Sequence, residues 1–247
     1  MTFKRACLVA SLSAFAIAPF AAPFAAAEEG MWTFDNFPAQ AVKDAYGWAP
    51  DAAWLDRIRT HSVRLDSGCS GSVISGQGLV LTNHHCVNAC IANLSTPEAD
   101  YMTDGFLAAT KEDEKICPGV EISILQDISD VTSTIQGVTK GLSPDAAKAK
   151  RDAEIARVEE ACAGDNPAVR CEVVSLYRGG QYKLYKYDRY SDVRLAFAPE
   201  LQAGFFGGDP DNFNFPRYAY DMAFLRLYKD GAPVRFDDWL RFDADGA

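Results

Sequence analysis

Thr82-Asn83-His84-His85-Cys86 follows directly on the apolar run Gly78-Leu79-Val80-Leu81. A matching run, Ser72-Val73-Ile74-Ser75, lies just upstream, and Gly76-Gln77-Gly78 separates the two. This pattern predicts two antiparallel strands joined by a tight glycine turn, with a histidine at the end of the second strand. A rigid strand end suits a general base, because misplacing a catalytic group by about 1 Å costs much of its effect.

The chain has three histidines, His61, His84 and His85. Because His84 and His85 are adjacent, they would point to opposite faces of a strand, so only one would face a given site. The alternative is a structural role for both. Adjacent histidines beside a cysteine do not have the ligand spacing of a zinc site, so no metal is expected. His61 has polar neighbours and is assigned no role.

A second candidate group lies late in the chain. Residues 207–220 are rich in Gly, Pro and Asn, and Asp221 opens the strand-like run that follows them. A carboxylate there would accept the Nδ1 proton of a histidine and stabilise the imidazolium. We interpret Asp209 and Asp211 as turn residues. No nucleophile is evident, since Ser70 and Ser72 precede the histidine in the first hairpin strand; a serine beyond Ala247 is favoured.

The N-terminus has the features of a secretory signal. Lys4 and Arg5 precede an apolar stretch, and the small residues Ala25-Ala26-Ala27 predict cleavage before Glu28. Pro19 and Pro23 interrupt the apolar stretch and favour a cleaved signal over a membrane anchor. We therefore expect an exported protein, periplasmic or on the cell surface of a Gram-negative bacterium, with no membrane span after cleavage.

Charge and cysteine content agree with export. Loss of Lys4 and Arg5 would move the formal net charge from −10 to about −12, which argues against nucleic acid as a partner. Cys7 lies in the signal, and six cysteines remain for disulfides in an oxidising compartment. Several pairings are open. Cys69 and Cys86 flank the predicted hairpin, Cys162 and Cys171 bracket a short loop, and Cys90 with Cys117 follows only by elimination.

Strand-like segments dominate the rest of the chain. They lie at 120–131, 171–177, 182–187, 193–197 and 222–228. Helical spacing occurs over 31–60, with a break at Pro50, and over 146–162, after the helix start Ser143-Pro144-Asp145 and before Gly164. The pattern predicts a mainly β protein with helical insertions, an antiparallel barrel rather than an alternating βαβ sheet.

Several motifs, in this order along the chain, resemble one family. They are Glu29-Gly30-Met31-Trp32, Gly68-Cys69-Ser70-Gly71-Ser72, Thr82-Asn83-His84-His85-Cys86, Tyr190-Ser191-Asp192-Val193-Arg194-Leu195 with Ala198-Pro199-Glu200, and residues 207–221. Together they resemble the bacterial serine dipeptidyl-peptidases seven and eleven and dipeptidyl aminopeptidase BII. Thr-Asn-x-His alone would indicate only a trypsin-like barrel.

The resemblance implies a fold and a set of roles. The fold is a chymotrypsin-like double β-barrel with a helical cap, of which residues 28–247 would form the first barrel with a helical insertion at about 143–163. The histidine before the cysteine, His85, would be the general base, and Asp221 would orient it. Asn212 would bind the substrate's N-terminal amine, and Phe213, often Trp in the family, would shape that pocket. The second barrel, most of the cap and the nucleophilic serine would lie outside this chain.

The implied activity is release of dipeptides from the free N-terminus of peptides, with no metal or organic cofactor. The resemblance also implies a homodimer. We expect residues 28–247 alone to be inactive, because a trypsin-like site lies between two barrels. The alternative from another class is a non-catalytic, disulfide-stapled binding protein of the same fold; an endopeptidase is a third interpretation. The preferred side chain before the cleaved bond is open between apolar and acidic.

Overall fold

The computed structural model describes residues 32–206 and 219–241. The strands are β1 (Ser62–Leu65), β2 (Ser70–Val73), β3 (Leu79–Thr82), β4 (Phe106–Leu107), β5 (Lys115–Ile116), β6 (Ile122–Asp130), β7 (Val169–Leu176), β8 (Gln181–Tyr190), β9 (Asp192–Ala198), β10 (Ala223–Lys229) and β11 (Ala232–Pro233). The α-helices are α1 (Ala39–Tyr46), α2 (Ala52–His61), α3 (Asn88–Leu94), α4 (Tyr101–Asp104), α5 (Thr132–Gly137), α6 (Pro144–Ala163) and α7 (Leu201–Gly204). Short 3-10 turns are η1 (Phe34–Asn36), η2 (His85–Val87), η3 (Lys111–Asp113) and η4 (Tyr177–Gly179).

The strands form one antiparallel sheet in the order β4-β9-β10-β3-β2-β1-β6-β8-β7, with β5 beside β9 and β11 beside β10. The prediction of a mainly β protein with helical insertions is confirmed. The prediction of a closed barrel is not, because strand pairing among the described residues runs from β4 to β7 without returning to its start. The chain does pass from β8 to β9 through a single residue, Ser191, so the two halves of the sheet stay close.

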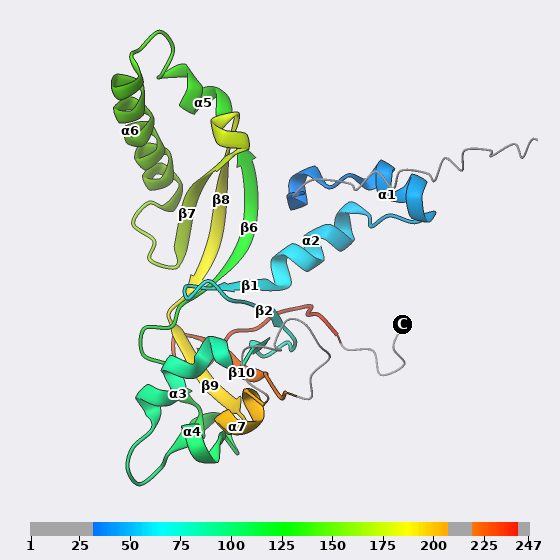
Figure 1. Cartoon of the computed structure of the whole chain (residues 1–247), viewed down its shortest axis with the longest axis vertical. Helices are drawn as coiled ribbons and strands as arrows, with labels where there is room; N and C mark the ends of the chain where they lie inside the picture. The colour runs from blue at the N-terminus through cyan, green and yellow to red at the C-terminus, as the bar shows by residue number, and fades with distance from the viewer. Residues whose placement is uncertain (1–31, 207–218, 242–247) are drawn as a thin grey trace, which may run out of the picture.

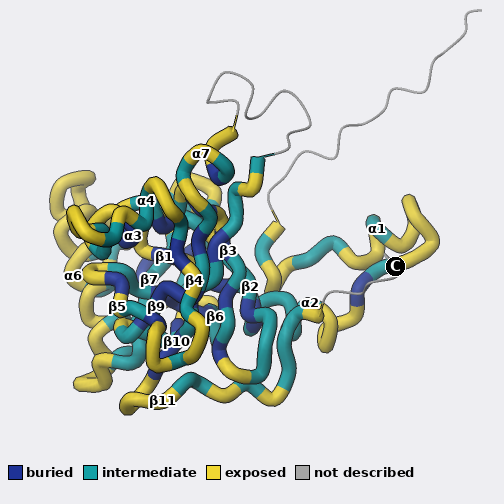
Figure 2. The backbone as a smooth tube through the Cα atoms, turned by 90° about the horizontal axis from the view of Figure 1, so that it is seen from below, coloured by how far each residue is buried: buried dark blue, intermediate teal, exposed yellow. Residues whose placement is uncertain are grey.

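One hydrophobic core lies inside the curled sheet. Its buried side chains come mainly from β1, β2, β3, β6, β9 and β10, with further members from β4, α3 and η2. They include Val63, Leu65, Val73, Val80, Ile91, Phe106, Ile122, Ile124, Val193, Leu195, Leu225 and Leu227. In β10, the inward-facing Ala223, Leu225 and Leu227 alternate with the half-buried Phe224 and Arg226. Figure 2 shows this buried interior among the strands, while α1 lies largely exposed to one side.

A second part of the molecule is an arm that extends from this body (Figure 1). The long strands β6, β8 and β7 form it, and α5 and α6 lie along it. As predicted, α6 begins after Ser143 with Pro144 at its first turn and ends at Gly164. The strand β6 carries a bulge at Gln126, where the pairing with β8 shifts by one residue. The Arg59 guanidinium of α2 donates to the carbonyl oxygens of Leu125 and Gln126 there.

The hairpin of β2 and β3 matches the sequence prediction closely. Ser72 pairs with Leu81 and Val73 with Val80. The Ser75 hydroxyl accepts hydrogen bonds from the backbone N–H groups of Gln77 and Leu79. Gly78 has a φ of +71°, and a Cβ there would meet two carbonyl oxygens at 3.0 Å, so the turn requires glycine at this position.

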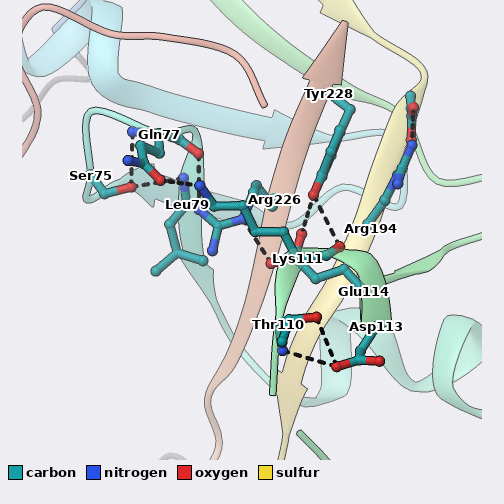
Figure 3. A network of polar contacts seen from close by, with 11 residues as sticks. Ser75, Gln77, Leu79, Thr110, Lys111, Asp113, Glu114, Arg194, Arg226 and Tyr228 are labelled. Atoms are coloured by element: carbon teal, nitrogen blue, oxygen red, sulfur yellow. Dashed lines mark hydrogen bonds and ion pairs between the residues drawn. The ribbon is translucent and has the colours of Figure 1, made fainter. Parts of the chain in front are cut away.

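A buried polar network ties the turn of this hairpin to β10 (Figure 3). Arg226 Nε lies 2.7 Å from Glu114 Oε1, and the Glu114 side chain is only 3% exposed. Tyr228 donates from its hydroxyl to Glu114 Oε2 at 2.8 Å. Arg226 also donates to the Gln77 carbonyl at 2.9 Å, which connects β10 to the turn. Burial, together with the hydrogen bond to Glu114, raises the pKa of Tyr228 to about 12.

The six cysteines form three disulfides, Cys69–Cys86, Cys90–Cys117 and Cys162–Cys171. These are the pairs that the hairpin, the loop and elimination suggested. The first links the residue just before β2 to η2, the second links α3 to the residue just after β5, and the third links α6 to β7. The chain is therefore covalently fastened at the hairpin, at the small helices and on the arm.

His61, at the C-terminal end of α2, has a structural position that the sequence did not reveal. Its Nδ1 lies 2.7 Å from the Arg57 carbonyl and its Nε2 lies 2.8 Å from the Asp238 carbonyl. Arg57 also pairs with the Asp238 carboxylate at 2.7 Å. Together these contacts fasten the segment after β11 to α2.

Candidate active site

The structure brings His85 and Asp221 together. His85 Nδ1 lies 2.8 Å from Asp221 Oδ2, and the backbone N–H of His85 donates to Oδ1 of the same carboxylate at 3.1 Å. Because an ionised carboxylate only accepts hydrogen bonds, the shared proton belongs on Nδ1. The Nε2 nitrogen then carries the free lone pair that a general base needs.

Both residues lie just outside the strands on which they were predicted. The strand β3 ends at Thr82, and His85 is the first residue of the 3-10 turn η2 rather than a strand-end residue. Asp221 lies two residues before β10, which begins at Ala223. Ala223 pairs with Thr82, so the antiparallel pairing of β3 and β10 places the two short extensions side by side. This register is what brings residues so distant in the sequence into contact.

The two members of the pair differ in exposure. The His85 side chain is 53% exposed, whereas that of Asp221 is 23% exposed. The imidazole is therefore open to a substrate, and the carboxylate behind it is shielded. This is the arrangement in which a carboxylate can fix a histidine tautomer without itself reaching the substrate.

Asn83 is a third member of the site that the sequence reasoning missed. Its side-chain N–H₂ donates to the Asp221 carbonyl at 3.0 Å and lies 3.3 Å from Asp221 Oδ2. It thus holds both the backbone and the side chain of the aspartate. Asn83 belongs to the motif that the sequence singled out, and an amide two residues before the histidine was the available signal.

His84 is oriented away from this pair and is buried, with only 1% of the residue exposed. Its Nε2 lies 3.0 Å from the Pro199 carbonyl. Burial lowers the pKa of His84, and the proximity of His85 acts in the same direction; the Pro199 carbonyl and the Asp221 carboxylate offset part of this effect. His84 is therefore neutral at pH 7. The two histidines do face different ways, although they lie in a helical turn and not on a strand.

Asn212 and Phe213 lie outside the described residues. Ser70 and Ser72 belong to β2, where they pair with β1.

None of the described helices is both long enough and apolar enough to cross a membrane.

The Cys69–Cys86 disulfide lies beside His85. A ring nitrogen of His85 and the two sulfurs are within 4.8 Å of one another, a spacing that would suit a metal ion. Both sulfurs are, however, joined to each other. Metal ligation by cysteine requires the thiolate, so this group is a structural support for the η2 turn and not a metal centre.

Comparisons with known proteins identify relatives over most of this chain. Dipeptidyl-peptidase 7 of Porphyromonas gingivalis is 35% identical over 173 residues, which cover 68% of this chain and 24% of that protein. The Asp/Glu-specific dipeptidyl-peptidase of Shewanella putrefaciens is 34% identical over 240 residues, which cover 89% of this chain and 32% of that protein. The chain thus spans about a third or less of the length of these relatives.

A solved structure shows the same fold. The crystal structure of Porphyromonas endodontalis DPP11 in complex with substrate superposes with a TM-score of 0.75 at 28% identity, covering 89% of this chain and 35% of that one. The family model for peptidase S46 matches residues 27–247, nearly the whole chain. On this match the chain belongs to the peptidase S46 family.

Proposed function

We propose that this chain supplies the general base and the orienting acid of a serine-type dipeptidyl-peptidase. His85 takes the proton of a serine hydroxyl as that oxygen attacks the peptide carbonyl, and later returns it to the leaving amine. Asp221 holds the imidazole in the required tautomer and stabilises its charged form. The single observation that carries this proposal is the 2.8 Å contact between His85 Nδ1 and Asp221 Oδ2.

The fold supports the same proposal. Strands from both halves of the sheet contribute to one hydrophobic core, and we infer that they belong to the first barrel of a chymotrypsin-like enzyme. In such enzymes the catalytic groups lie between two barrels. We infer that the nucleophilic serine belongs to the part of the relatives' length that this chain does not span, and that residues 28–247 alone do not hydrolyse peptides.

The substrate class rests on the resemblance and on the names of the relatives. We infer that Asn212 binds the free α-amine of a peptide and that Phe213 provides an aromatic wall beside it. Release of a dipeptide follows if the amine is anchored two residues from the reactive carbonyl. Residues 1–27 contain two basic residues, then an apolar stretch, then three small residues, which is the order of a secretory signal. This supports export to the periplasm or the cell surface, where such a peptidase would act on extracellular peptides.

The test uses the full-length enzyme that this proposal implies. Dipeptides with a fluorogenic leaving group are offered with a free or an acetylated N-terminus, and with an apolar or an acidic residue before the scissile bond. We expect hydrolysis of the free forms only, and its loss in the His85→Ala variant. Equal hydrolysis of acetylated substrates would point to an endopeptidase, and hydrolysis that survives His85→Ala would refute the proposal.

A further inference from the structure

His84 is the buried neighbour of the proposed base, and the proposed chemistry leaves it unused. Its ring packs against Gly204, the last residue of α7. A Cβ at Gly204 would lie 2.7 Å from His84 Cγ and 2.9 Å from Nδ1. Side chains do not approach this closely, so the imidazole occupies the space that any larger residue at 204 would fill. Gly204 is therefore matched to His84.

The contact is polar as well as steric. His84 Nε2 donates to the Pro199 carbonyl at 3.0 Å, just before α7 begins at Leu201. His84 thus holds α7 at both ends, by a hydrogen bond at its start and by ring packing at its end. A short helix of this kind depends on such tertiary contacts for its position.

The helix α7 is in turn connected to the proposed acid. The backbone N–H of Tyr220 donates to the Ala203 carbonyl at 2.8 Å. Tyr220 immediately precedes Asp221, whose carboxylate holds His85. These contacts form a closed chain, called the circuit below. His84 contacts α7, α7 binds the backbone of Tyr220, and Asp221, the residue after Tyr220, contacts His85, which is bonded to His84 in the sequence.

We propose that His84 is a positioning residue for the His85–Asp221 pair, acting through α7 and the Tyr220 backbone. This inference rests on the proposed function. Within the circuit, Asn83 and His85 fix Asp221 from one side, while His84 fixes the backbone that leads into Asp221 from the other. An error of about 1 Å in that backbone would be enough to lower turnover about 10²-fold.

The neutrality of His84 suits this role. A neutral imidazole can donate from Nε2 to a carbonyl while adding no positive charge beside His85. A cation in this position would oppose protonation of the neighbouring base, which must become an imidazolium during the reaction. The side chains of His85 and Asp221 both influence the pKa of His84, in opposite directions.

Three variants of the full-length enzyme test the proposal. His84→Phe keeps an aromatic ring and removes the donor, Gly204→Ala forces the ring away, and His84→Gln keeps an N–H donor for Pro199. Ile135→Ala is the matched control, because Ile135 is fully buried in α5 on the arm and should lower stability without touching the circuit. Two readouts apply: kcat and KM, and the low-field proton resonance of His85 Nδ1, assigned by its absence in His85→Ala.

We expect His84→Phe and Gly204→Ala to lower kcat about 10- to 100-fold with KM changed little, and to shift or broaden the low-field resonance. His84→Gln should retain part of the wild-type kcat and part of the resonance. Ile135→Ala should change neither kcat nor the resonance. A normal resonance and normal kcat in His84→Phe and Gly204→Ala would overturn the positioning role. If His84→Phe does not fold, Gly204→Ala and His84→Gln decide by the same two readouts. If the wild-type enzyme shows no His85-dependent hydrolysis, the proposed function fails, yet the resonance still tests whether His84 positions His85.

Discussion

Nδ1 of His85 lies 2.8 Å from Oδ2 of Asp221, although 136 residues separate them in the chain. The antiparallel register of β3 and β10 produces this contact, since both residues extend from paired strand ends. Asn83, on the same short extension as His85, adds a second connection to Asp221. The pair is therefore set by the sheet and not by a flexible loop.

The first prediction concerns the carboxylate. Asp221→Asn in the full-length enzyme should lower kcat about 10⁴-fold, because an amide can stabilise the wrong tautomer of His85. Initial rates with a free dipeptidyl substrate measure the effect. Asp104→Asn, an exposed aspartate on α4, is the control and should leave the rate unchanged. Normal turnover in Asp221→Asn would reject its orienting role.

The second prediction concerns pH and His84. Burial lowers the pKa of His84 below the ordinary value of 6.5, so the unfolded chain binds a proton that the folded chain refuses. The stability from this residue is complete above pH 6.5 and is lost as the pH falls below it. His84→Gln should flatten the decline in unfolding free energy between pH 6.5 and 5 by up to about 1.4 kcal/mol per pH unit.

Urea unfolding of the wild-type and His84→Gln proteins at several pH values measures this slope. Other titrating groups are common to both proteins, so the difference between the two curves isolates His84. Parallel curves across this pH range would show that His84 is protonated as easily in the folded protein as in the unfolded one.

A third prediction concerns the buried network that joins β10 to the hairpin turn. Glu114→Gln removes the negative charge that pairs with Arg226. The Arg226 guanidinium, whose side chain is only 13% exposed, then has no ionic partner there. We expect a loss of about 3–5 kcal/mol in unfolding free energy, as for other broken buried ion pairs. Tyr228→Phe removes the hydroxyl that contacts Glu114 and the Lys111 carbonyl but leaves the Glu114–Arg226 ion pair, and should cost about 1–3 kcal/mol.

Denaturant titration measures both variants. Glu112→Gln is the matched control, since Glu112 is an exposed neighbour in the same turn and has no place in the network. Equal stability of Glu114→Gln and Glu112→Gln would contradict the prediction. In the folded wild-type protein, spectrophotometric titration should also show a tyrosine that ionises near pH 12.

The fourth prediction compares two disulfides. Cys90–Cys117 closes a separation of 27 residues, and Cys162–Cys171 one of 9 residues. On chain-entropy grounds, removing the first pair as a double alanine variant should cost about 3.5 kcal/mol and removing the second about 2.6 kcal/mol. Cys90 and Cys117 are also fully buried, which adds to the difference. A larger loss on removing Cys162–Cys171, measured by thermal unfolding, would contradict this order.

Local sequence signals predicted much of the fold. Gly76-Gln77-Gly78 between two apolar runs gave the β2–β3 hairpin, and Ser143-Pro144 marked the start of α6. Such features depend on residues close in the chain, where turn and cap chemistry act. The two-residue strands β4 and β5 were not predicted, because each is defined by its pairing with β9 and not by a hydrophobic pattern of its own.

The candidate site divides in the same way. His85 and Asp221 were found because their side chains carry chemistry and stand beside strand-like runs. His84 and Gly204 were not matched to each other, since a backbone carbonyl and an absent Cβ leave no trace in residue type. Glu114 precedes the strands of the arm in the sequence and Arg226 follows them. No local sequence pattern therefore predicts that these two residues pair.

The bulge at Gln126 has a mechanical consequence. The ten residues of β8 span about 34 Å, and β8 runs unbroken from the body into the arm. A strand bends most readily at a bulge. Here, however, the Arg59 guanidinium on α2 donates hydrogen bonds to the carbonyl oxygens of the bulge. We therefore expect Arg59 to restrain bending at the bulge, and so to fix the direction in which β6 and β8 leave the body.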